Sequence, residues 1–282
     1  MNALLLLTTL VCLSMQSVFR KIYAGRTGGG GVYTYTVIAG AGTLLFFIAT
    51  SKGFVWDARI IPYAVIFAIS YIVAGVFGLK AIATGSLSLT SLVTNCSLIL
   101  PTFYGLIFLS EESSVFLYAG IILLIAALVM VNKTGETTPV TGKWLLFVSV
   151  AFIGNGMCSI SQKAQQDAFA GAGKNELMII ALAIVVVVNF VFVLLTERKN
   201  LVSYVKKGWL NGLLGGAFNG VVNLFVMFLV GRLPASVVFP LISGGGIVLT
   251  YIISRVFYKE KLSRQQTIGF MLGIASIVLL NL

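Results

Sequence analysis

The sequence contains few charged residues, and this shortage restricts the class of protein. Asp, Glu, Lys and Arg make up 10% of its 282 residues, whereas a soluble domain carries about 25% charged residues. Because 59% of the residues are hydrophobic, a soluble fold could not remove this much apolar surface from water. The composition therefore predicts an integral membrane protein.

Several kinds of functional site are also missing from the sequence. It has no histidine, and its eight Asp and Glu residues do not cluster, so we expect no metal site and no cofactor. The three cysteines are odd in number and lie in apolar segments, which argues against a disulfide framework. No nucleophile–base or carboxylate–metal pair is evident, so we expect no enzyme activity.

Long apolar runs account for most of the chain. A helix needs about 20 apolar residues to cross the hydrocarbon core, and the sequence offers ten such segments, at about 2–19, 32–51, 60–79, 86–109, 115–132, 144–162, 177–196, 209–231, 235–257 and 265–281. The runs are continuously apolar rather than alternating, which favours helices over a barrel. We predict an all-α integral membrane protein with ten transmembrane helices.

The net charge of +11 comes from basic residues in loops and at helix ends. This placement fits the surface of a lipid bilayer, and no soluble nucleic-acid-binding module is present. Partners are therefore expected to be the bilayer and a small-molecule substrate, with no nucleic acid. The odd-numbered connections hold most of the Lys and Arg, which by the positive-inside rule places both termini outside the cytoplasm.

The two halves of the chain repeat each other. "SVFRK" ends the first span and "SISQK" the sixth, while "LSEESSVFLYAGIILLIAALVMVN" and "YKEKLSRQQTIGFMLGIASIVLLN" match across the fifth and tenth. The boundaries are then 1–132, a Pro/Gly/Thr-rich linker at 133–143, and 144–282. Because five is odd, the second copy must enter the membrane upside down, which predicts two inverted five-helix repeats around a central cavity.

This arrangement resembles the drug/metabolite transporter superfamily in its ten-helix, EamA-like form. The resemblance is carried by Glu112 and Glu260, by Gly120 and Gly269 that follow them, and by "GSLSLTSLV" and "LPASVVFPL" at the starts of the fourth and ninth spans. It implies a cavity lined mainly by helices 1, 3, 4, 6, 8 and 9. It also implies both termini in the cytoplasm, against the charge distribution.

Neutral polar residues within those spans are the candidate binding residues. Asn219 and Asn223 are four apart and share a helix face, and no carboxylate is expected at the membrane centre. Such side chains either bind substrate or join helices to one another. The candidate substrate-binding residues are Gln16, Tyr71, Asn95, Asn155, Ser159, Lys163, Asn219, Asn223 and Ser243. Other basic residues near span ends, such as Arg20, are expected to extend toward the interface.

The glycine run in "VFPLISGGGIVL" is not a phosphate loop, because no lysine follows it and no strand precedes it. Inside a bilayer, glycine permits close helix packing or a local break. We expect gating bends at Pro101, Pro240, Gly244, Gly245 and Gly246.

These features predict a transporter in the plasma membrane that moves a small polar or zwitterionic organic metabolite by alternating access, as a facilitator, an exchanger or a secondary transporter. A multidrug or cationic-compound exporter is the alternative, disfavoured by the missing central carboxylate. An intramembrane lipid-modifying enzyme is an alternative from another class. The sequence leaves open the substrate, the direction of transport, and whether the protein is a monomer or a homodimer.

Overall fold

The computed structural model describes residues 2–51, 53–85, 90, 93–94, 96–111, 114–132, 141–258 and 264–279. Within these residues the chain is helical and contains no strand. Of the residues singled out in the sequence, Asn95, Glu112, Glu260 and linker residues 133–140 lie outside the described part of the chain.

The α-helices follow one another with short connections. They are α1 (Asn2–Thr27), α2 (Val32–Thr50), α3 (Ile61–Thr84), α5 (Ile99–Phe108), α6 (Val115–Asn132), α7 (Gly142–Ala168), α8 (Lys174–Phe192), α9 (Leu201–Val230), α10 (Ala235–Tyr258) and α11 (Arg264–Leu279). Shorter turns are η1 (Ala58–Ile60), η2 (Val193–Glu197) and η3 (Arg198–Asn200).

Helix α1 is longer than the expected span at 2–19, because it continues through Arg20 and Lys21 to Thr27. Arg and Lys are good helix formers, so a basic pair does not end a helix by itself. Gly28 and Gly29 end it, with φ of 64° and 79°, and the N–H of Gly29 bonds back to Ala24 O at 2.9 Å. That left-handed glycine termination is a common C-cap.

The expected fourth span at 86–109 is interrupted. Ser97 and Leu98 form a turn ahead of α5, and the N–H of Leu100 bonds to Ser97 O in place of a regular helical bond. Pro101 has no N–H to bond Ser97 O, so the helical ladder cannot pass this point intact. By contrast, α10 stays helical through Pro240 and Gly244–Gly246.

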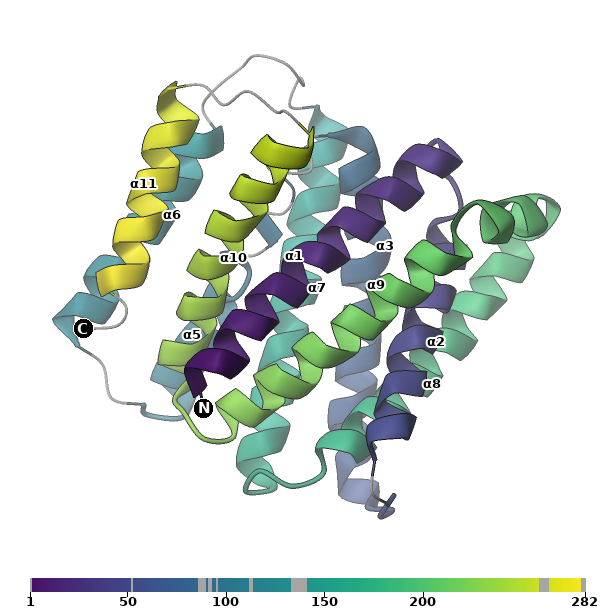
Figure 1. Ribbon diagram of the computed structural model, residues 1–282. Coiled ribbons are helices and arrows are strands. Elements are labelled where there is room, and N and C mark those ends of the chain that lie inside the picture. Colours follow the sequence, from purple (N-terminus) through teal and green to yellow (C-terminus); the bar gives the residue numbers. More distant parts are fainter. Residues whose placement is uncertain are drawn as a thin grey trace.

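The helices pack as neighbouring pairs (Figure 1). Helix α1 contacts α9, α3 contacts α7, and α2 contacts both α8 and α9, while α6 pairs with α11 and α5 with α10. The α6–α11 pair lies at one edge of the bundle and α2 with α8 at the other. Both termini lie at the same end of the bundle, called here the termini side.

The distribution of polarity suits a lipid environment. Large apolar side chains are exposed on the outside, among them Leu45, Ile69, Ile107 and Leu195, while Thr43, Gln162 and Asn219 are buried. Among the described residues, five helical stretches are long and apolar enough to cross a membrane: Leu4–Thr27, Val32–Thr50, Ala58–Thr84, Gly142–Ala168 and Lys174–Val230. Shorter apolar helices are Ile99–Phe108, Val115–Ala127 and Ala235–Gly246.

Glycine permits the close approach of α3 and α7. A Cβ atom on Gly154 of α7 would lie 2.9 Å from both Ser70 O and Ala74 N of α3. Small residues at such crossings let two backbones approach, which is how helices associate in membranes. This contact holds together the two helices that carry much of the site described below.

We expect Gly154→Ala to lower the melting temperature of the purified protein, because its Cβ would meet α3 backbone atoms that cannot rotate away. Overpacking of this kind costs roughly 1–3 kcal/mol. Gly25→Ala is the matched control, since it also changes a helical glycine but its Cβ would meet nothing within 4 Å. Equal melting temperatures for the two variants would contradict the close α3–α7 contact.

Candidate functional site

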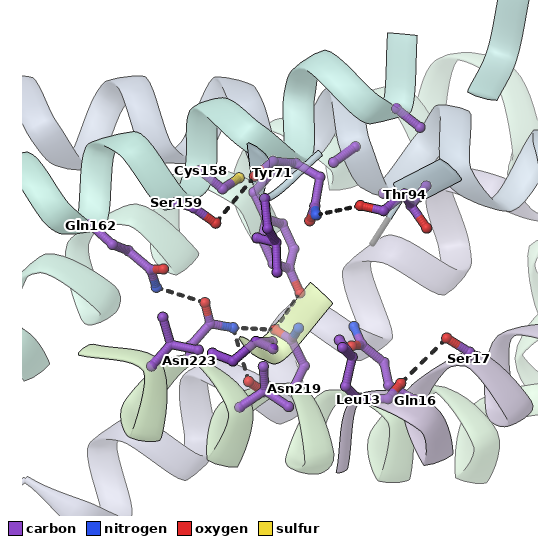
Figure 2. Close-up of a pocket in the computed structure, with 18 of the residues that line it drawn as sticks. Leu13, Gln16, Ser17, Tyr71, Thr94, Cys158, Ser159, Gln162, Asn219 and Asn223 are labelled. Atoms are coloured by element: carbon purple, nitrogen blue, oxygen red, sulfur yellow. Dashed lines mark hydrogen bonds between the residues drawn. The ribbon is translucent and has the colours of Figure 1, made fainter. Parts of the chain in front are cut away.

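A cavity of about 110 Å³ lies between the helices that carry the buried polar residues. Its lining comes from α1, α3, α7, α9 and α10, together with Thr94 and Leu98 at the interrupted fourth span. Its polar lining residues are Gln16, Ser17, Arg20, Tyr71, Thr94, Asn155, Cys158, Ser159, Gln162, Asn219 and Asn223. Figure 2 shows most of these side chains converging from several helices.

A chain of hydrogen bonds crosses the cavity wall from α7 through α9 to α3 (Figure 2). Gln162 Nε2 donates to Asn223 Oδ1 at 2.7 Å, and Asn223 Nδ2 donates to Asn219 Oδ1 at 2.9 Å. The Tyr71 hydroxyl also donates to Asn219 Oδ1, at 2.9 Å. Asn219 and Asn223 can meet because residues four apart stack on one helix face. These hydrogen bonds therefore join α3, α7 and α9, and they pair amide and hydroxyl groups that would have no partner in a bilayer.

Gln16 of α1 faces the same cavity and takes no part in that chain. Its side chain is 8% exposed, and it has no hydrogen-bond partner among the described residues. The Nδ2 group of Asn219 likewise has no acceptor among them. These groups remain available to a polar ligand.

Asn155 supports the interruption of the fourth span. Its Nδ2 donates to Thr94 O at 3.2 Å and to the Ser97 hydroxyl at 2.7 Å. Thr94 O also accepts the N–H of Ser97 at 3.2 Å, so the Asn155 amide adds a side-chain donor to the turn that interrupts the span. Asn155 and Ser159 both line the cavity, and Asn155 also holds its shape.

Two candidates from the sequence lie elsewhere. Lys163 and Ser243 do not line the cavity, and Ser243 is buried within α10. In the other direction, sequence reasoning assigned Arg20 to the membrane interface, whereas its side chain lines the cavity. The available signal was spacing, since Arg20 follows Gln16 by four residues and shares its helix face.

Lys163 forms a buried ion pair with Glu111. Its Nζ lies 3.1 Å from Glu111 Oε1, with the two side chains 9% and 10% exposed, and it also donates to Val230 O at 3.4 Å. Glu111 in turn accepts the N–H groups of Ala235 and Ser236, both at 2.9 Å. This set of five residues is called here the latch.

The latch places each charge at a favourable helix end. Glu111 binds the first N–H groups of α10, where the helix dipole is positive, and Lys163 binds the last carbonyl of α9, where it is negative. Burial alone would raise the pKa of the Glu111 carboxyl, but the N–H groups of Ser236 and Ala235 and the Lys163 ammonium outweigh it and hold the pKa below its ordinary value. Glu111 is therefore a carboxylate at neutral pH.

The latch lies directly beyond the cavity. Gln162 lines the cavity and Lys163 follows it; Val226 lines it and Val230 lies one turn further along α9; Ser236 precedes the lining residue Phe239. Helices α7, α9 and α10 therefore each extend from the cavity to the latch, which lies at the termini side of the bundle.

Taken together, the fold and the site define a multi-pass membrane protein with a polar cavity enclosed between its helices. A family model described as the EamA-like transporter family matches residues 141–282. The chain belongs to that family, and it is a membrane transporter of the drug/metabolite transporter type.

Comparisons with individual proteins give information on the fold only. No curated protein matches the sequence. Among solved structures, one titled "Crystal structure of protein" is 14% identical with a TM-score of 0.73, over 99% of this chain and 95% of the other. At that identity the likeness concerns the arrangement of helices.

We expect Glu111→Gln to destabilise the protein by about 3 kcal/mol, because it leaves the Lys163 ammonium buried without its counter-ion. Asp57→Asn is the matched control, since it removes a carboxylate from the exposed ion pair with Arg59 and should change little. Thermal unfolding of both variants measures the difference. A Glu111 variant as stable as the control would contradict the latch.

The pH dependence follows from the lowered pKa of Glu111. A depressed carboxyl pKa gives stability that is complete above the unfolded-state pKa and is lost as the pH falls through the folded-state pKa. The Lys163→Met variant removes one of the groups that lower the pKa of Glu111. Because the unfolded-state pKa does not change, the melting temperature of the variant should begin to fall at the same pH as that of the wild type, but the total fall should be smaller and complete at a higher pH. Identical profiles would rule the coupling out.

Proposed function

We propose that this transporter moves a small polar or zwitterionic organic metabolite, amino-acid-like in its chemistry, across the plasma membrane by alternating access. The observation that carries the proposal is the amide of Gln16, which has no hydrogen-bond partner among the described residues and lies in a cavity lined by further amides and hydroxyls. An amide without a partner inside a bilayer is costly unless a ligand or water binds it. Transport as a facilitator, as an exchanger or as a secondary transporter is consistent with this site.

We also propose that the chain crosses the membrane ten times as two inverted repeats, 1–132 and 144–282, joined by the linker at 133–143. The contacts support this, since α1 packs on α9 as α7 packs on α3, and α2 on α9 as α8 on α3. Tyr71 and Asn219, which match in the repeat, touch through a hydrogen bond. Residues related by a two-fold axis can touch in this way only near that axis.

In this proposal the latch is the closed gate of the termini side. It joins the end of α9, the start of α10, the segment after α5, and α7 through four residue contacts. Opening the cavity to that side requires the ion pair to separate. Inverted repeats supply such a movement by rocking one helix bundle against another around a fixed site.

The cavity argues against export of large cationic drugs. Its volume of about 110 Å³ lies below the roughly 300–1,000 Å³ of sites that enclose drug-sized molecules. The only charged side chain among the described lining residues belongs to Arg20, which repels a cation. A small molecule with several polar groups fits better.

The Gln16→Met variant distinguishes a substrate-binding role of Gln16 from a structural role in helix packing. Gln16 makes no hydrogen bond within the described structure, so the variant should keep the wild-type melting temperature. It should nevertheless lower the affinity for the transported metabolite roughly tenfold, the loss of one hydrogen bond of about 1.4 kcal/mol. Uptake by proteoliposomes, with substrates first selected by a thermal-shift screen of metabolites, measures it.

The contrasting variant is Asn219→Ala, which removes the acceptor used by both Tyr71 and Asn223. It should lower stability as well as uptake. If Gln16→Met lowered stability and left uptake unchanged, Gln16 would be a structural residue and the proposed site would be wrong.

Coupling to protons is tested by the same vesicles. None of the described lining residues carries a carboxylate that could exchange a proton for substrate. We therefore expect the uptake rate of an electroneutral zwitterion such as serine to be the same with and without an imposed pH gradient. A strong acceleration by the gradient would defeat the facilitator and exchanger forms of the proposal.

A further inference from the structure

Arg20 is a cation in the cavity wall, and none of the described carboxylates forms an ion pair with it. Its side chain lines the cavity, and its Nε is buried and has no hydrogen-bond partner within the described ranges. Its Nη1 lies beside α3, at 3.6 Å from where a Cβ on Gly78 would stand. The guanidinium also lies near the hydroxyls of Tyr35 and Tyr71, which can accept a hydrogen bond but carry no formal charge to balance it.

No acidic group of the described chain neutralises it. The described carboxylates, which lie at helix ends or in connections, are Asp57, Glu111, Asp167, Glu176 and Glu197. None of them lines the cavity. Glu111 is committed to Lys163, and Asp57 to Arg59. An arginine keeps its charge at any physiological pH, so the positive charge persists in the wall.

The second half of the chain shows what occupies the corresponding place. In the matched segments "SVFRK" and "SISQK", Arg20 corresponds to Gln162, and Gln162 is satisfied by Asn223. Because Tyr71 corresponds to Asn219, the first-half counterpart of Asn223 is Gly75, which also lines the cavity. Where one half has an amide pair, the other half has an arginine and a glycine at the corresponding positions.

We propose that the cavity recognises its substrate by an anionic group, a carboxylate in the first instance, with Arg20 as the counter-ion. This inference rests on the proposed function and specifies its substrate class. The planar guanidinium can bind a carboxylate through two parallel N–H···O bonds. A filled site is then neutral overall, which lowers the cost of enclosing the cation within the bilayer.

A phosphate group can bind the guanidinium in the same way as a carboxylate. The size of the cavity distinguishes between these two kinds of ligand. A cavity of about 110 Å³ holds only a small molecule, which favours a carboxylate on a short carbon skeleton over a sugar phosphate or nucleotide. Inorganic phosphate remains small enough to serve as a direct competitor in the test.

Matched ligands test the charge requirement. Purified protein is heated with lactate, serine or inorganic phosphate, and separately with lactamide, serinamide or glycerol. We expect the carboxylates to raise the melting temperature and their amides to leave it unchanged, since only ligands that bind the folded state stabilise it. Phosphate stronger than both carboxylates would overturn the carboxylate assignment, and equal effects of acids and amides would overturn the anion proposal.

Variants locate the effect at Arg20. Arg20→Gln installs the residue found at the matching position of the other half, and it should weaken binding of the stabilising carboxylate roughly tenfold to a hundredfold. Arg20→Lys should retain part of the affinity, because the charge remains without the two-pronged geometry. Arg26→Gln is the control: it removes the same charge from α1 at an exposed site, where the side chain bonds Lys207 O.

The two proposals can fail separately. If proteoliposomes take up serinamide or glycerol and Arg20→Gln leaves that uptake unchanged, the anion proposal is wrong while transport of a small polar metabolite stands. If Arg26→Gln weakens carboxylate binding as much as Arg20→Gln, the effect is general electrostatics and the assignment to Arg20 is wrong. If no probe is taken up or bound by the folded wild type, the proposed function itself fails.

Discussion

The lack of water inside a bilayer is the constraint on which this structure depends, because every polar group there needs a partner within the protein. Helices α3, α7 and α9 meet that need with one another, through the hydrogen bonds that link Gln162, Asn223, Asn219 and Tyr71. On the α1 side of the cavity, Gln16 and the Nε of Arg20 have no hydrogen-bond partner among the described residues. The satisfied groups hold the cavity together, and the unsatisfied groups on α1 define where a ligand gains most.

Carboxylates outside the cavity perform a different task, which is to join helices at their ends. Glu111 binds the first N–H groups of α10, and Glu197 binds the N–H groups of Tyr33 and Thr34 at the start of α2. These contacts lie at opposite ends of the bundle. Negative charge at these helix N-termini fixes the geometry of both ends, while the described lining of the cavity contains no carboxylate.

Composition and apolar run length were enough to predict a membrane protein of helices, because both follow from the thickness and polarity of the bilayer. Local chemistry that depends on distant residues was not predictable. Lys163 resembled a site residue, but its partner Glu111 comes from a separate connection. Arg20 resembled an interfacial residue because it lies near the end of the expected span, yet α1 continues beyond it to Thr27, where two glycines end the helix. The repeat itself and the roles of the site residues remain predictions.

The free energies of the buried ion pair and of the hydrogen bonds to a ligand connect the latch to the choice of substrate. Leaving one charge of a buried ion pair such as Glu111–Lys163 without its partner costs about 3–5 kcal/mol while it stays buried, and a ligand shifts a conformational equilibrium only by its difference in affinity between the two states. One neutral hydrogen bond contributes about 1 kcal/mol, whereas bonds to a charged group contribute about 1.5–3 kcal/mol. A neutral molecule held by Gln16 alone therefore cannot balance the latch. A ligand that binds Arg20 through an anionic group and the amides through its other polar atoms can, so the residues that define the substrate would also decide when the gate opens.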